Sequence, residues 1–134
     1  KRTVLEIISG WEQLSRKILD SLRDSNRTAF ILVTIAESLG VRLTGRVLEE
    51  LEEFRLPVRH LIVNHLVREA DCPFHRRRQA MQEPYLRLLR ETYGRQRTVV
   101  EVPLLPDEVR GLRQIEEISG FLFSGAGRPR GDSP

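Results

Sequence analysis

The chain has 134 residues, of which 40% are hydrophobic and 31% are charged, so it suits one domain or a large piece of one. No apolar run approaches the ~20 residues needed to span a bilayer. The single cysteine, Cys72, excludes an internal disulfide, which agrees with a cytoplasmic protein that is at most peripheral to a membrane. The net charge of +3 is small. The few aromatic residues are not interleaved with basic ones, which argues against nucleic-acid binding.

The first quarter of the chain reads as a helix followed by a strand. Apolar residues recur at helical spacing from Trp11 to Leu22, which predicts a helix over about residues 10–23. The turn-forming residues 24–26 end that helix. Residues 29–35 are a continuous apolar, partly β-branched run, which is typical of a strand covered on both faces in a parallel sheet.

A second helix and a second strand follow. The apolar stripe from Val47 to Phe54 predicts a helix that ends before Pro57, and residues 60–64 predict a strand. The opposite side of this helix is acidic, which is most simply a solvated face and alternatively a partner-binding surface. Its acidic residues are Glu49, Glu50, Glu52 and Glu53.

The third strand is predicted at residues 98–102, after a long arginine-rich helix with Met81, Tyr85, Leu88 and Thr92 on one face. Pro84 inside that helix predicts a kink or a restart. A last helix is expected at about residues 112–123. Strands separated by helices are typical of an α/β fold, here a parallel sheet segment with covering helices. We expect residues 1–123 to form this unit and residues 124–134 to be a disordered tail.

Two features at predicted strand ends fit a nucleotide base. Asn64 ends the second strand, and open α/β sheets bind ligands at the carboxyl ends of their strands. Its amide offers one donor and one acceptor, which matches an edge of adenine. Pro103, Leu104 and Leu105 end the third strand and form an apolar ledge. The plainer interpretations are a turn residue at Asn64 and a ledge that packs under the last helix.

Three segments in this order, residues 62–66, 72–75 and 103–111, resemble the C-terminal half of the arsenical pump-driving ATPases. That family includes the ATPases that target tail-anchored proteins. The resemblance runs from about Trp11 to Leu122 and implies part of the three-layer fold of a P-loop NTPase. It also implies that Asn64 and the ledge hold the adenine of ATP. His65 replaces the glutamine that follows the asparagine in the family.

The same resemblance points to a metal site at Cys72 and His75. The targeting ATPases have Cys-x-x-Cys here, and two copies enclose one zinc ion at the dimer interface. This chain has Cys72-Pro-Phe-His75. Imidazole is a legitimate zinc ligand, so two copies would supply two sulfurs and two nitrogens. The plainer interpretation is a neutral histidine at a helix start beside a half-buried thiol.

No Gly-x-x-x-x-Gly-Lys loop occurs in the sequence. We therefore expect a C-terminal fragment of an ATPase without catalytic residues of its own, in which ATP and Mg²⁺ are bound mainly by chain that precedes Lys1. The expected partners are that N-terminal half, a second copy, and a membrane transporter or a hydrophobic client protein. Two alternatives are a dimerising, zinc-binding module that is not an enzyme, and a fragment of a partition-type ATPase that acts on nucleic acid.

Overall fold

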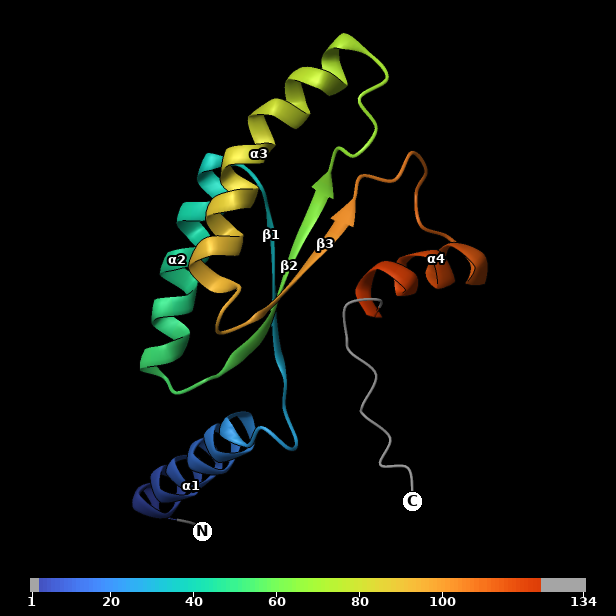
Figure 1. The fold of residues 1–134 in the computed structure, drawn as a ribbon. Coiled ribbons are helices and arrows are strands. Elements are labelled where there is room, and N and C mark those ends of the chain that lie inside the picture. Colours follow the sequence, from blue (N-terminus) through green and yellow to red (C-terminus); the bar gives the residue numbers. More distant parts are fainter. Residues whose placement is uncertain (1–2, 124–134) are drawn as a thin grey trace, which may run out of the picture.

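The computed structural model describes residues 3–123, which form an α/β unit. Three parallel strands lie in the order β1-β2-β3. Helices α2 and α3 cover one face of the sheet and α4 lies on the other (Figure 1). The elements are α1 (Val4–Arg23), β1 (Phe30–Ile35), α2 (Ser38–Glu53), β2 (Val58–Leu66), α3 (Pro73–Tyr93), β3 (Thr98–Pro103) and α4 (Leu112–Phe123). The predicted parallel sheet with covering helices is confirmed, whereas the predicted tail lies outside the described residues.

Helix α1 starts earlier than the predicted residue 10, because the helical spacing of its apolar residues continues back to Val4. Thr3 caps it: the Thr3 side chain accepts a hydrogen bond from the Glu6 amide, and the Glu6 carboxylate accepts one from the Thr3 amide. The helix has no buried residue and lies apart from the sheet (Figure 1). Arg23 Nε donates to Phe54 O at 2.9 Å. Within residues 3–123, nothing covers the apolar face of α1, on which Trp11 is 69% exposed.

The hydrophobic core lies between the sheet and α3. Alternate residues of β2 point to opposite faces, so Leu61 and Val63 are fully buried under the helices while Ile62 and Asn64 face the side of α4. The core cluster consists of Ala36, Leu61, Val63, Leu66, Leu86 and Leu89. The α4 side is packed more loosely, since α4 has no buried residue.

Helix α3 runs without interruption through Pro84, so the alternative of a restart at that residue is wrong. The three consecutive arginines of α3, residues 76–78, are partly paired, because Arg78 forms an ion pair with Glu37 at the start of α2. The four glutamates of the α2 face are exposed, as expected for a solvated surface. None of the helices between residues 3 and 123 combines the length and the apolar character that crossing a membrane requires.

Two glycines of α2 give a matched stability test. A Cβ at Gly40 would lie 2.6 Å from Ile35 O, whereas a Cβ at Gly45 would meet only the Tyr93 hydroxyl, at 3.5 Å. Alanine gains about 1 kcal/mol over glycine in a helix interior. We expect Gly45→Ala to raise the free energy of unfolding by up to about 1 kcal/mol and Gly40→Ala to lower it. Urea denaturation measures both, and equal effects would contradict the close approach at Gly40.

Candidate functional site

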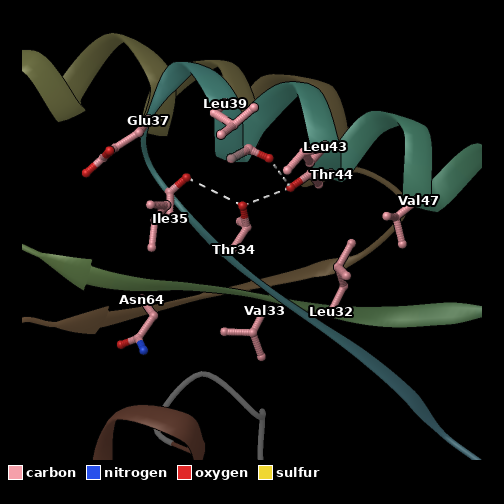
Figure 2. A pocket seen from close by; sticks show the side chains of 11 residues that line it. Leu32, Val33, Thr34, Ile35, Glu37, Leu39, Leu43, Thr44, Val47 and Asn64 are labelled. Atoms are coloured by element: carbon pink, nitrogen blue, oxygen red, sulfur yellow. Dashed lines mark hydrogen bonds between the residues drawn. The ribbon is translucent and has the colours of Figure 1, made fainter.

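Asn64 lies at the carboxyl end of β2, on the sheet face opposite α2 (Figure 2). Its Oδ1 accepts a hydrogen bond from the His65 amide at 2.9 Å. Among residues 3–123 no group accepts from its Nδ2, so the amide presents a donor outward. Asn64 belongs to a cavity of about 420 Å³ that extends around the open edge of β1. That cavity also involves Leu39, Leu43 and Val33.

The ledge, Pro103–Leu105, continues from the end of β3. The Leu104 amide donates to Leu66 O at 2.8 Å, which ties the ledge to the end of β2. The chain then turns into α4 through Gly111, whose φ of 81° favours glycine. The ledge borders a cavity of about 690 Å³, called here the ledge cavity. The ledge cavity is lined by Val67, Arg68, Glu69, Asp71, His75, Pro103, Leu104, Leu105, Pro106, Glu117 and Phe121.

Asn64 and the ledge therefore lie at the same end of the sheet, where the neighbouring strands β2 and β3 end. They do not line the same cavity, because Asn64 faces the open side of β1 while the ledge faces α4 and the start of α3. What shares the ledge cavity is the side chain of His75, which the sequence places in a separate metal site. The adenine contacts of Asn64, Pro103, Leu104 and Leu105 stay predictions.

Asp71, Cys72 and His75 form one cluster at the start of α3, with their potential ligand atoms within 4.8 Å of one another. Cys72 caps α3, and its Sγ accepts from the His75 amide at 3.4 Å. Asp71 Oδ1 lies 2.5 Å from His75 Nδ1. This hydrogen bond to His75 is the main reason that the pKa of Asp71 is lowered.

Asp71 is the ligand candidate that the sequence reasoning missed. Its signal was present, since Asp71 precedes His75 by four residues and adjoins Cys72. With Asp71, a single chain offers a thiolate, an imidazole and a carboxylate, which are the donors that zinc accepts. Alternatively, the carboxylate orients the imidazole through Nδ1 and leaves Nε2 for a metal ion. Either arrangement fits zinc better than Cys72 and His75 alone.

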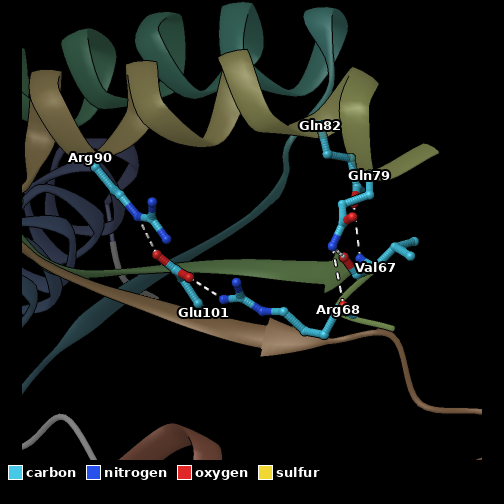
Figure 3. Close-up of polar contacts among 6 residues, drawn as sticks. All are labelled: Val67, Arg68, Gln79, Gln82, Arg90 and Glu101. Atoms are coloured by element: carbon cyan, nitrogen blue, oxygen red, sulfur yellow. Dashed lines mark hydrogen bonds and ion pairs between the residues drawn. The ribbon is translucent and has the colours of Figure 1, made fainter. Parts of the chain in front are cut away.

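Glu101 of β3 bridges two arginines beside the site (Figure 3). Arg90 Nε donates to Glu101 Oε1 at 2.5 Å, and Arg68 Nη2 donates to Glu101 Oε2. Burial by itself raises the pKa of this carboxyl, but the hydrogen bonds from Arg90 and Arg68 outweigh it, and the net effect lowers the pKa. Glu101 thus connects α3, β3 and the segment after β2.

This network predicts an acid-dependent loss of stability. Because the pKa of Glu101 is lower in the folded state than its usual 4.5, its contribution is complete above that value and disappears as the pH falls through the folded pKa. We expect Glu101→Gln to lower the free energy of unfolding at pH 7 by about 1 kcal/mol, allowing for solvent screening. The difference from the parent chain should shrink as the pH falls below 4.5. Urea denaturation between pH 3 and 7 checks this, with Glu116→Gln as a surface control.

Comparison with known proteins decides the family. The model of the anion-transporting ATPases matches residues 3–124. The chain belongs to this family. Its relatives include ATPase GET3 of Malassezia globosa, which is 30% identical over 119 residues that cover 87% of this chain and 36% of the relative. ATPase get3 of Sclerotinia sclerotiorum is 31% identical over 124 residues, which cover 90% of this chain and 36% of the relative.

The ATPase ASNA1 homolog of Leishmania braziliensis is 35% identical over 116 residues, which cover 84% of this chain and 28% of the relative. This anion-transporting ATPase chain therefore spans about a third of the length of the relatives it matches. The resemblance predicted from the three sequence segments is confirmed at the level of the family.

Proposed function

We propose that this chain is the C-terminal portion of an ATP-hydrolysing enzyme, in which it forms the edge that binds adenine. The observation that carries the proposal is the hydrogen bond from the Leu104 amide to Leu66 O. It brings the apolar ledge beside the carboxyl end of β2, which carries Asn64, at the end of the sheet where α/β folds bind ligands. Asn64 and the ledge line separate cavities but lie at the ends of adjacent strands. A base that spans these strand ends would stack on Pro103–Leu105 and accept a hydrogen bond from Asn64 Nδ2.

The rest of the enzyme is proposed to join at the open edge of β1. In the described part of the chain, β1 and β3 are the two outer strands of the sheet, and β1 has no partner on the side away from β2. Ile31 and Val33 remain more than half exposed on the face opposite α2. Parallel sheets are normally covered on both faces. A further strand from the N-terminal ATPase portion, which would also bring Mg²⁺ and the phosphate-binding loop, therefore fits this edge.

The intact enzyme is proposed to act as a cytoplasmic homodimer, at most peripheral to a membrane. Family membership supports two kinds of client, an anion such as arsenite passed to a membrane transporter, or the hydrophobic segment of a membrane protein. ATP hydrolysis would drive either process through closure of the two subunits.

The test is the substitution Asn64→Ala in the full-length protein. We expect ATP affinity to fall about tenfold, the cost of one or two hydrogen bonds to the base, in a protein that thermal unfolding shows to be still folded. Asn26→Ala is the matched control, because Asn26 is an exposed turn residue outside the site. Isothermal titration with ATP gives the affinities. An unchanged affinity for Asn64→Ala would remove this residue from the nucleotide site.

The cluster of Asp71, Cys72 and His75 supports a second candidate function, a zinc-binding module that dimerises without catalysing a reaction. This alternative needs metal uptake but no nucleotide binding. Zinc analysis together with the ATP titration therefore separates it from the ATPase proposal.

A further inference from the structure

Strand β2 is distorted at His65, directly after Asn64 and just before the strand ends at Leu66. His65 has a φ of 59°, in the left-handed region that residues other than glycine adopt at a cost of about 1–2 kcal/mol. The register between β2 and β3 shifts at the same place, between Val63 and Leu66. Such a conformation persists only where the surrounding structure holds it. The hydrogen bond from the His65 amide to Asn64 Oδ1 is one support from within the strand, and contacts from outside the strand add to it.

Gln82 of α3 supplies those outside contacts. Its side chain is buried, with 3% of the residue exposed. Gln82 Nε2 donates to His65 O at 2.9 Å, and Gln82 Oε1 accepts from the Val67 amide, also at 2.9 Å. The two ends of the Gln82 amide thus bind the backbone at His65 and at Val67. Figure 3 shows Gln82 reaching from α3 to this segment.

His65 connects Gln82 to Asn64. The carbonyl of His65 accepts from Gln82, and its amide donates to Asn64 Oδ1 at 2.9 Å. The orientation of the Asn64 amide, with Nδ2 facing outward, therefore depends on the backbone conformation that Gln82 holds. A donor aimed in one direction distinguishes bases better than a freely rotating amide.

We propose that Gln82 is a positioning residue for base recognition, acting through His65 on Asn64. The inference rests on the proposed function, because it assigns Gln82 a role in the adenine contact of Asn64. It also gives α3 a part in nucleotide binding. Helix α3, which begins after the Cys72 cap, carries Gln82 in its third turn. A displacement of α3 therefore changes the direction in which Asn64 Nδ2 points.

The experiment uses the full-length protein and two substitutions. Gln82→Met keeps the length of the side chain and removes both hydrogen bonds. Gln82→Glu keeps the acceptor for the Val67 amide and loses the donor to His65 O. We expect each to lower ATP affinity about tenfold and to reduce the preference for ATP over GTP. Gln79→Met is the control, since the Gln79 amide reaches only the carbonyls of Val67 and Arg68, beyond the end of β2.

A double variant separates positioning from general stability. If Gln82 acts through Asn64, then Asn64→Ala with Gln82→Met binds ATP no more weakly than Asn64→Ala alone. Losses that multiply would overturn the inference. The ratio of ATP to GTP affinity is measured on the folded molecules, so partial unfolding does not imitate the effect. An effect of Asn64→Ala with none of Gln82→Met would refute the role of Gln82 and leave the proposed function intact. No effect of Asn64→Ala would refute both.

Discussion

Leu89→Ala is expected to lower the free energy of unfolding by about 3 kcal/mol, because it leaves a cavity at the centre of the packed face. Leu89 is fully buried in the cluster that joins α3 to the sheet. The preceding residue provides the matched control, since Leu88 is 47% exposed on the same helix. Both substitutions change helix propensity equally, so their difference reports burial alone. Urea denaturation of the two variants measures it.

Leu88→Ala should cost less than about 1 kcal/mol. The comparison is informative because side chains of β1 on the sheet face opposite α2 stay exposed. The buried core therefore depends mainly on the packing of α3 against the sheet. Similar losses for both variants would mean that α3 does not pack as the structure has it.

The sequence predicted a helix or strand correctly wherever the spacing of apolar residues within that element is typical of its type. The continuous apolar run near residue 30 and the stripe of α2 predicted the parallel sheet with its helices, all of which the structure contains. The apolar face of α3 was assigned wrongly, because Met81, Leu88 and Thr92 are exposed. The residues of α3 that are buried are Gln82, Leu86 and Leu89. The start of α1 was missed, although Val4, Ile7 and Ile8 continue the apolar spacing of Trp11 towards the N-terminus and the Thr3–Glu6 capping box marks the first turn. The β2 strand is longer than the predicted residues 60–64, since the polar residues Arg59 and His65 interrupt the apolar run on either side.

The candidate site was only partly accessible from the sequence. Strand ends placed Asn64 and the ledge at one edge, but which cavity each side chain faces depends on the register shift after Val63, which leaves no pattern in the sequence. Asp71 was recognisable by its spacing from His75. Gln82 was not, because its role arises from a contact between α3 and a backbone segment that lies 17 residues earlier at His65.

The second large effect concerns zinc. If Asp71, Cys72 and His75 hold a zinc ion, Cys72→Ser and His75→Ala are each expected to weaken zinc affinity at least about 100-fold, because each removes a direct ligand. Asp71→Asn should cost about 10-fold to 100-fold if the carboxylate orients the imidazole. Glu69→Gln is the control, because Glu69 is a neighbouring carboxylate outside the cluster. Competition against a chromophoric chelator measures the affinities.

The number of zinc ions per chain tests the arrangement itself. A shared ion with two thiolates and two imidazoles binds half an equivalent of zinc per chain and requires a dimer. Three donors in one chain leave a single position of a tetrahedral zinc to fill, which water can occupy. We therefore expect one equivalent per chain, at an affinity that does not depend on protein concentration. Half an equivalent, with zinc-dependent dimerisation, would favour the shared ion and remove Asp71 from the ligand set, whereas no uptake would exclude both arrangements.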